Sequence, residues 1–458
     1  MSKEYDIIVV GGGPGGYVAA IKAAQLGASV ALVEKEVVGG ICLNHGCIPT
    51  KTFLKSAKTY ETLQNAKAFG LTTTGEIGFD WTKIVGRKDR VVKQLTGGVS
   101  FLLKKNKVDV YNGYGEIKSR NEVVVNKETL KTKNVVIATG ATAIIPPIPG
   151  AKEAYDAKQL VTSRELLNVK EVPKKLVIVG GGVIGVEFAT IFNSFGSEVI
   201  IIERLPEVIS MMDEEIQTTY HKALTGSGIK VLTSASVTKI DGTKVTYTLN
   251  DKEETINSDL ILMAVGTKAN SNGLESLNLK MDRGNIVTNE YLQTNVPGIY
   301  AIGDVNGKHM LAHVASYEGI IAVSHILNKK PQGINYDRIP SAIYGSPEIA
   351  AIGLTEKEAK ERGLDYKVSK VPVAAVGKAL ADGEREGFVK LIVDKKYLEV
   401  LGAHIIAYNA TELISEYSVA MTSEATAYEI ANSIHPHPTL SELTLEAALG
   451  AIDKPIHV

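Results

Sequence analysis

Two copies of one glycine-rich pattern constrain the fold of this chain more than any other feature. Each copy has a short apolar run, a glycine turn, a small-residue helical pattern, a second apolar run and a terminal glutamate. The turn glycines and terminal glutamates are Gly11, Gly13, Gly16 and Glu34 in the first copy, and Gly180, Gly182, Gly185 and Glu203 in the second. Corresponding positions such as 11 and 180, or 34 and 203, are each 169 residues apart.

This order is typical of a strand, turn, helix and strand that bind a dinucleotide. The first glycine makes the turn, the second admits a pyrophosphate to the helix N-terminus, and the third lets helix and strand approach. The glutamate at the end of the second strand is suited to a ribose diol. A single pattern of this kind is weak evidence, and two turns that bind nothing are the alternative. The repetition with paired glutamates favours two nucleotide-binding units in tandem.

The only two cysteines among 458 residues, Cys42 and Cys47, lie close together in the sequence. A reducing compartment disfavours a structural disulfide, and a loop this short removes little entropy from the unfolded chain. Positions five apart lie on different faces of a regular helix, so a redox pair here requires local distortion, which Gly46 and Pro49 permit. Lys51 lies one turn after Cys47 and would favour a thiolate or a reduced cofactor. Two incidental buried cysteines are the alternative.

The composition limits which partners and which cellular location we expect. Lys plus Arg (50) nearly equals Asp plus Glu (51), so no electrostatic attraction to nucleic acid or to an anionic membrane is expected. The longest uncharged stretch, residues 135–151, contains three prolines and two glycines, which argues against a membrane helix. The first apolar run follows acidic residues and leads into glycines, so it reads as a strand rather than a signal peptide. We expect a soluble, cytoplasmic protein, and we predict no metal site.

The remaining segments predict further domains of an α/β chain. The apolar run 135–138 ends at Thr139 and Gly140, and the run 260–265 closes the second unit at Gly266. Residues 298–302 predict a strand that ends at Gly303 and Asp304, before a helix over 311–327. Beyond residue 338 come strand patterns over 341–351, 368–374 and 388–407, and then helical patterns over 410–432 and 439–449. We therefore predict domains over residues 1–145, 146–270, 271–338 and 339–458.

With these features assembled, the sequence resembles the flavoprotein pyridine nucleotide-disulfide oxidoreductases over essentially its whole length. The most specific matches are Gly39–Lys51 around the cysteines, Leu311–His313, and His435–Glu442. The resemblance implies FAD on the first unit, a nicotinamide nucleotide on the second, a central domain that completes the FAD site, and a C-terminal α+β dimerisation domain. The implied fold is two tandem Rossmann-like domains with these two additions.

The resemblance also assigns residues. At FAD it places Gly11, Gly13, Gly16, Glu34, Lys51, Thr139, Gly140, Gly303, Asp304 and Ala312. At the pyridine nucleotide it places Gly180, Gly182, Gly185, Glu203 and Gly266. Glu203 favours NAD over NADP, because a carboxylate accepts hydrogen bonds from a ribose diol and repels a 2′-phosphate, and Arg204 tempers this only slightly.

The implied chemistry is a relay between thiols. Cys42 meets the substrate and Cys47 meets the flavin, while His437, oriented by Glu442, is a base that acts across a homodimer on the cysteines of the other subunit. We read His435 as structural. His45 lies between the cysteines, where it could tune a thiolate, but we expect it to face solvent. His313 has either a flavin or a packing role. The run Thr267–Asn270 departs from the Arg and Pro-Asn pattern that the family often has there, which leaves the local cofactor contacts open.

The members that the chain most resembles oxidise protein-bound dihydrolipoyl groups and reduce NAD. No lipoyl domain precedes Tyr5, so we expect the lipoyl group on another protein, either an acyltransferase of a 2-oxo acid dehydrogenase complex or a lipoyl protein of glycine cleavage. Glutathione reductase-like enzymes prefer NADPH, which Glu203 opposes. Mercuric and larger thioredoxin reductases need C-terminal redox residues, which residues 452–458 do not contain, and soluble transhydrogenases lack the first cysteine. A flavin-bound sensor without turnover would not need His437 and Glu442.

Overall fold

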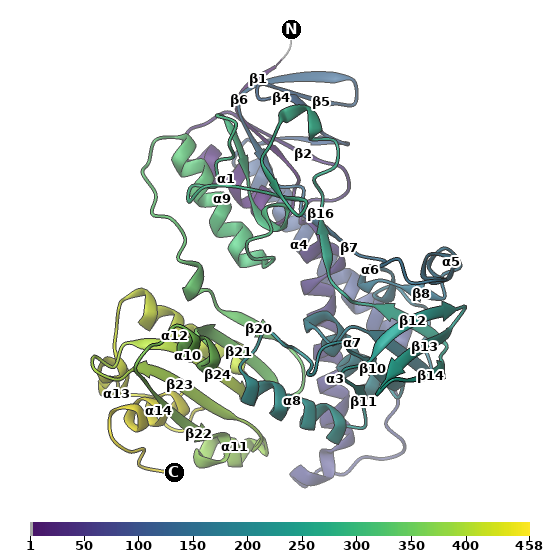
Figure 1. Cartoon of the computed structure of the whole chain (residues 1–458), viewed down its shortest axis with the longest axis vertical. Coiled ribbons are helices and arrows are strands. Elements are labelled where there is room, and N and C mark those ends of the chain that lie inside the picture. Colours follow the sequence, from purple (N-terminus) through teal and green to yellow (C-terminus); the bar gives the residue numbers. More distant parts are fainter. Residues whose placement is uncertain (1–2) are drawn as a thin grey trace.

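The first of three main sheets forms around β1 in the N-terminal part of the molecule (Figure 1). The computed structural model describes residues 3–458. The strand order is β3-β2-β1-β6-β5-β4, and β19 also pairs with β6. Strands β3, β2, β1, β6 and β19 are parallel, whereas β4 and β5 are antiparallel. The strands are β1 (Glu4–Val10), β2 (Val30–Glu34), β3 (Asp109–Asn112), β4 (Glu116–Ser119), β5 (Glu122–Val125), β6 (Glu128–Ile137) and β19 (Ile299–Ala301).

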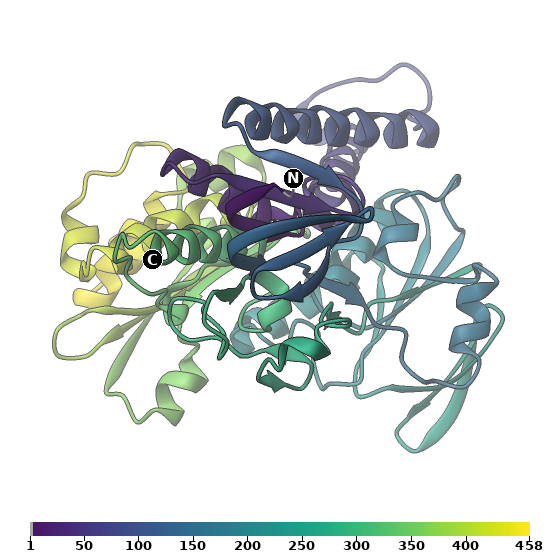
Figure 2. The same ribbon diagram turned by 90° about the horizontal axis from the view of Figure 1, so that it is seen from above.

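Helices cover one face of this sheet. Apolar residues of β1, such as the fully buried Ile7 and Val9, pack there against α1, α4 and α9. Close contact between α1 and α9 depends on small residues, since a Cβ on Gly319 would lie 2.7 Å from the carbonyl oxygen of Gly15. Figure 2 shows α1 and α9 side by side near the N-terminus. The helices of this part are α1 (Pro14–Gln25), α2 (Gly40–His45), α3 (Cys47–Gln64), α4 (Trp81–Lys105) and α9 (Ala312–Ile326), with 3₁₀ turns at Ala66–Phe69, Glu275–Leu277, Gly303–Asn306 and Tyr336–Arg338.

The second unit has a parallel sheet of the order β11-β10-β9-β15-β8. An antiparallel three-stranded sheet, β12-β13-β14, lies beside it, and the short pair β7 and β16 connects the two units. The strands are β7 (Ala141–Ala143), β8 (Leu160–Val161), β9 (Lys175–Val179), β10 (Glu198–Ile202), β11 (Lys230–Leu232), β12 (Ser236–Asp241), β13 (Lys244–Leu249), β14 (Lys252–Asn257), β15 (Leu260–Met263) and β16 (Thr267–Ala269). The helices are α5 (Ala151–Asp156), α6 (Ser163–Leu166), α7 (Val183–Ser194) and α8 (Glu214–Gly226).

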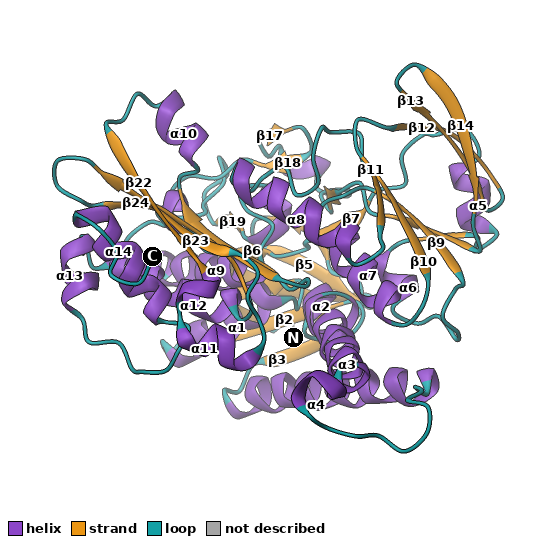
Figure 3. Cartoon of the chain, turned by 90° about the horizontal axis from the view of Figure 1, so that it is seen from below, coloured by secondary structure: helices purple, strands orange, loops and turns teal. Residues whose placement is uncertain are grey.

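The C-terminal part contains an antiparallel sheet of the order β20-β21-β24-β23-β22, with helices on one face (Figure 3). Its other face joins a core that also contains residues of α3, α7 and α8, such as Phe53, Phe188 and Tyr220. The strands are β20 (Ser341–Ile343), β21 (Glu348–Gly353), β22 (Tyr366–Pro372), β23 (Phe388–Asp394) and β24 (Val400–Ala407). The helices are α10 (Glu356–Glu361), α11 (Gly377–Asp382), α12 (Ala410–Thr422), α13 (Ala427–Asn432) and α14 (Glu442–Ile452), and a 3₁₀ turn, Val373–Ala375, follows β22. One short strand pair, β17 (Met281–Asp282) with β18 (Asn285–Ile286), precedes β19 in the chain.

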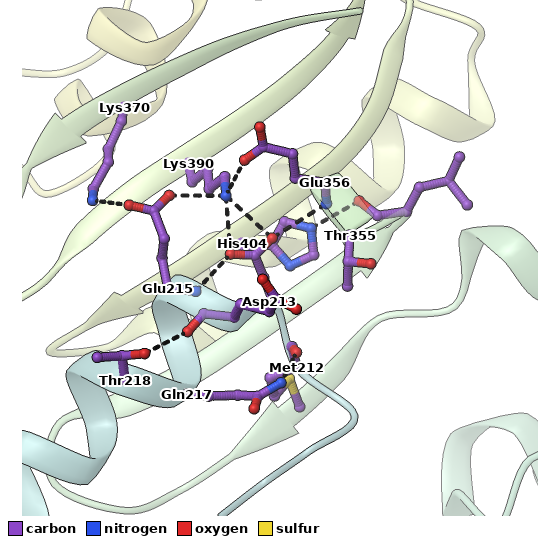
Figure 4. A network of polar contacts seen from close by, with 12 residues as sticks. Met212, Asp213, Glu215, Gln217, Thr218, Thr355, Glu356, Lys370, Lys390 and His404 are labelled. Atoms are coloured by element: carbon purple, nitrogen blue, oxygen red, sulfur yellow. Dashed lines mark hydrogen bonds and ion pairs between the residues drawn. The ribbon is translucent and has the colours of Figure 1, made fainter. Parts of the chain in front are cut away.

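A buried lysine joins the C-terminal sheet to the second unit (Figure 4). Lys390 of β23, whose side chain is 2% exposed, lies 3.0 Å from Asp213, 2.8 Å from Glu215 and 2.6 Å from Glu356. Asp213 also caps α8 by accepting a hydrogen bond from the backbone N–H of Glu215. His404 of β24 lies next to this group and is buried. We call these five residues the Lys390 network.

The predicted α/β class and order of elements are confirmed. The helical part of the chain after the cysteines is interrupted between α3 and α4, where Gly70 and Gly75 have φ values of 73° and 84°. Residues 271–338 contribute β19 to the first sheet and α9 to its helical face, so they pack with the N-terminal unit. The four domain boundaries stay a prediction. Among residues 3–458, no helix combines the length and apolar character needed to cross a membrane.

Candidate active site

One large cavity contains both glycine turns and both cysteines. Its volume is about 1890 Å³, and it runs between the first sheet, the second unit and the start of the C-terminal sheet. Nearly all residues that the sequence assigns to cofactors line it: Gly11, Gly13, Gly16, Glu34, Cys42, Cys47, Lys51, Thr139, Gly140, Gly180, Gly182, Glu203, Gly266, Gly303, Asp304 and Ala312. Gly185, His437 and Glu442 are not among the lining residues.

The first glycine turn leaves room for a pyrophosphate. A Cβ on Gly11 would lie 2.1 Å from the carbonyl oxygen of Ala138, and one on Gly16 would lie 1.8 Å from that of Gly11. At Gly13, in contrast, the nearest heavy atom to such a Cβ is 3.9 Å away, so the approach to the N-terminus of α1 is open. Gly11 and Gly16 therefore make the turn tight and the helix close, while Gly13 faces a ligand.

Glu34 is held in place beside this turn. Its two carboxylate oxygens accept hydrogen bonds of 2.7 Å from the backbone N–H groups of Gly12 and Glu36. A carboxylate offers about four acceptor positions, so two are left for a ribose diol in the cavity. The turn and Glu34 together fit the adenosine diphosphate part of FAD.

The second turn repeats this geometry. A Cβ on Gly180 would lie 2.4 Å from the carbonyl oxygen of Ala264, one on Gly185 would lie 2.0 Å from that of Gly180, and one on Gly182 would meet nothing within 4 Å. Glu203 accepts hydrogen bonds from the backbone N–H groups of Gly181, at 2.6 Å, and Leu205, at 2.7 Å. The residues of this unit therefore fit a second dinucleotide with an unmodified ribose.

The two cysteines lie on either side of a break between helices. Gly46, with φ −146° and ψ −108°, ends α2, and α3 begins at Cys47, which confirms the expected local distortion. Both cysteines are free thiols and are partly buried. Their mutual hydrogen bond raises the pKa of Cys42. The same bond lowers the pKa of Cys47. Burial opposes this effect and the positive charge of Lys51 adds to it, so that the pKa falls to about 7. Cys47 is thus the better thiolate of the two.

Lys51 lies between two partners that the sequence did not predict. Its Nζ donates to both carboxylate oxygens of Glu187, at 2.9 and 2.8 Å, and lies 4.5 Å from the centre of the Tyr344 ring. Glu187, on α7, is 3% exposed and also accepts a hydrogen bond from the backbone N–H of Tyr344. These three residues come from the first unit, the second unit and the C-terminal sheet, so no local sequence signal connects them.

Asp304 and Asn270 complete the wall of the cavity. Burial raises the pKa of Asp304, which lies in the 3₁₀ turn before α9. Asn270 and Thr139 form two hydrogen bonds, one from each side chain to the other residue's carbonyl oxygen, at 2.7 and 2.9 Å. Within the unusual run Thr267–Asn270, the first three residues form β16, and Asn270 attaches the end of that strand to the first unit.

His437 and Glu442 form a pair, as the sequence predicts, but away from the cysteines. Nδ1 of His437 lies 2.9 Å from a carboxylate oxygen of Glu442, and this hydrogen bond lowers the pKa of the Glu442 carboxyl. The His437 side chain is 75% exposed. The flanking helices α13 and α14 are well separated from α2 and α3 in Figures 1 and 3. Within one chain the pair therefore faces outward.

The other histidines have separate environments. Nε2 of His435 contacts Glu416 at 2.8 Å, in agreement with a structural role. His45 is half-buried at the cavity, 3.8 Å from Glu36, rather than facing solvent as expected, and burial lowers its pKa. His313 donates a hydrogen bond of 2.9 Å from Nε2 to the carbonyl oxygen of Pro340, which favours the packing role.

Comparisons with known proteins agree with this geometry. Residues 5–319 match the pyridine nucleotide-disulphide oxidoreductase family, and residues 339–448 match its dimerisation domain. A dihydrolipoyl dehydrogenase of Acholeplasma laidlawii is 70% identical over 336 residues, which cover 73% of this chain and 100% of that protein. A dihydrolipoyl dehydrogenase of Bacillus subtilis (strain 168) is 42% identical, with 100% of both chains covered. The solved structure of the HOCl-induced flavoprotein disulfide reductase RclA from Escherichia coli has a TM-score of 0.86 and 28% identity, and the match covers 97% of this chain and 99% of that one.

Proposed function

The chain belongs to the pyridine nucleotide-disulphide oxidoreductases, and on that premise we propose that it is a dihydrolipoyl dehydrogenase, which oxidises dihydrolipoyl groups to lipoyl groups and reduces NAD⁺ to NADH. The observation that most supports this proposal is the position of Cys42 and Cys47 in one cavity with two glycine turns and two aligned glutamates. A dithiol substrate, a flavin and a nicotinamide then share a single space.

FAD and NAD(H) are the cofactors of this family, and the two turns are suited to them. Gly11, Gly13 and Glu34 would hold FAD, together with Thr139, Gly140, Gly303, Asp304 and Ala312. Gly180, Gly182, Glu203 and Gly266 would hold NAD, and Gly185 allows the close packing of α7. When bound, FAD supplies the transfer of an electron pair from a dithiol to the nicotinamide.

The cysteines supply the disulfide exchange. In the oxidised enzyme they share a disulfide bond, and the structure contains their reduced form. A substrate thiolate attacks Sγ of Cys42, the S–S bond breaks, and Cys47 leaves as a thiolate. The second substrate thiolate then attacks the sulfur bound to Cys42, forms the lipoyl disulfide and releases the Cys42 thiolate. The positive charge of Lys51, which lowers the pKa of Cys47, favours this thiolate as the leaving group.

His437 supplies the base from a second copy of the chain. Each substrate thiol loses a proton to the imidazole of His437, while Glu442 fixes the ring through Nδ1. The outward-facing position of this pair and the dimerisation domain support a homodimer in which each His437 serves the partner's cysteines. The substrate in the cytoplasm would be a dihydrolipoyl group on an acyltransferase or on a glycine cleavage lipoyl protein.

A steady-state assay tests the function. We expect turnover with dihydrolipoamide and NAD⁺, weak turnover with NADP⁺, and none with glutathione disulfide and NADPH. Replacing Cys42→Ser should abolish lipoamide turnover but leave electron transfer from NADH to a dye. Lipoamide turnover at the wild-type rate in that variant would contradict the mechanism. No turnover with intact FAD would favour a redox sensor.

Mixed dimers test the shared site. A dimer of one Cys42→Ser chain and one His437→Gln chain has one site with both an intact Cys42 and an intact His437. Such a dimer, isolated with two different tags, should regain about half of the wild-type rate, whereas each homodimer stays inactive. If the mixed dimers are also inactive, His437 does not act across the interface.

A further inference from the structure

Two lysines on one face of α3 each lie against a tyrosine ring of the C-terminal sheet. Nζ of Lys51 is 4.5 Å from the ring centre of Tyr344, and Nζ of Lys58 is 3.8 Å from that of Tyr408. The two lysines are about two helical turns apart, so they share a face. Each tyrosine directly follows a strand, β20 or β24. The structure therefore contains two similar cation–π contacts, of which only one is near the cysteines.

Tyr344 holds both members of the ion pair next to Cys47. Its ring covers the ammonium of Lys51, and its backbone N–H donates a hydrogen bond of 2.9 Å to Glu187. Glu187 is 3% exposed, and its carboxylate binds Lys51 through both oxygens. The ammonium is thus held between a carboxylate and an aromatic face. A lysine without the ring would have more room to turn toward the open cavity.

Several charged groups surround Cys47 and the contact between Lys51 and Tyr344. Cys47 is influenced by Cys42, by the positive charge of Lys51 and by the negative charge of Glu187. Burial raises the pKa of the Tyr344 hydroxyl, and the charges of Glu348, Glu187, Glu412 and Cys47 add to this effect. Tyr344 is therefore a neutral phenol at physiological pH, and its ring acts on Lys51 as a fixed quadrupole.

We propose that Tyr344 is a positioning residue that holds the ammonium of Lys51 beside Cys47, through its ring on one side and through Glu187 on the other. The proposal rests on the proposed function only in that Cys47 is taken as the thiol next to FAD. The C-terminal sheet then contributes to the electrostatics of the redox centre of its own subunit, in addition to any residue it presents to a partner.

The test measures the Cys47 thiol directly. In holoenzyme that carries Cys42→Ser, Cys47 is the only cysteine of the chain. The rate at which iodoacetamide alkylates Cys47, followed by mass spectrometry across pH, gives the midpoint of thiolate formation. Adding Tyr344→Phe should leave this midpoint unchanged, since the ring is kept. Adding Tyr344→Leu should raise it by about half to one pH unit, because Lys51 is less well held near the sulfur.

Two further variants make the result decisive. Tyr408→Leu removes the matched contact at Lys58 and should leave the midpoint unchanged. Trifluorophenylalanine at position 344 keeps the shape of the ring but weakens its negative face, so it should raise the midpoint even if Tyr344→Leu does not fold. FAD content and melting temperature verify that each variant is folded.

Two results would overturn the proposal. In the first, the trifluoro and Leu variants share the midpoint of Tyr344→Phe. In the second, Tyr408→Leu shifts the midpoint as much as Tyr344→Leu, which would indicate general loosening of the C-terminal sheet. Because alkylation needs no lipoyl substrate, the outcome is independent of whether dihydrolipoamide is turned over.

Discussion

Replacing Lys390→Met is expected to destabilise the protein by about 3 kcal/mol at neutral pH. The Lys390 side chain is 2% exposed, and its ammonium lies within 3.0 Å of Asp213, Glu215 and Glu356. Methionine fills most of the same volume but leaves these carboxylates facing one another. Removing one partner of a buried ion pair costs about 3 to 5 kcal/mol. The lower end applies here, since Glu215 and Glu356 retain 43% and 41% side-chain exposure.

The pH dependence of this loss has a definite sign. Burial raises the pKa of Asp213, but the charges of His404 and Lys390 outweigh it, and the folded pKa falls below 3.8. Burial also raises the pKa of Glu215, but the hydrogen bonds and charges of Lys370 and Lys390 outweigh this effect and lower the pKa overall. In wild type the network therefore stabilises the fold above the unfolded pKa values and loses this contribution as pH falls through the folded ones. In Lys390→Met, protonation instead relieves repulsion, so the deficit should shrink below about pH 5.

Urea unfolding of FAD-saturated protein at pH 7 and pH 4.5 measures both effects. The control is Lys378→Met, because Lys378 pairs with Asp382 at the surface, with 40% and 26% side-chain exposure, and its loss should cost less than about 1 kcal/mol. The reasoning is wrong if Lys390→Met is no less stable than the control at pH 7, or if its deficit is the same at both pH values.

The remaining predictions concern the site. His437→Gln should lower lipoamide turnover by about 10²- to 10⁴-fold, as measured in steady state, with electron transfer from NADH to a dye unchanged; an equal fall in both rates would contradict its role as base. Glu203→Ser should shift the ratio of kcat/KM values toward NADP⁺, since the repulsion of a 2′-phosphate is removed. Gly16→Ala should give protein without FAD, measured by absorbance, because its Cβ would lie 1.8 Å from a carbonyl oxygen, whereas Gly97→Ala in α4 meets nothing within 4 Å and should retain FAD.

Local patterns predict the parts of this molecule that local physics determines. The glycine turns and their glutamates are recognisable because each depends on residues within one strand, turn and helix. Glu187 and Tyr344 could not be predicted, since they reach Lys51 from distant parts of the chain and no spacing connects them. Lys390 did leave a signal, as the only charged residue within the buried run Phe388–Val393 of β23. A lysine in such a strand requires buried carboxylates, but the sequence does not say which ones.

The pairing of β19 with β6 determines the order in which the chain can fold during synthesis. Val135 of β6 leaves the ribosome long before its neighbour Ile299, and the whole second unit lies between them. Until β19 has been synthesised, the N-terminal sheet therefore keeps an unpaired strand edge. The second unit precedes β19 in the chain, so it can complete its own sheet earlier. We expect the first nucleotide site to mature last, and nascent chains that end before residue 299 to be more prone to aggregation than chains that include α9.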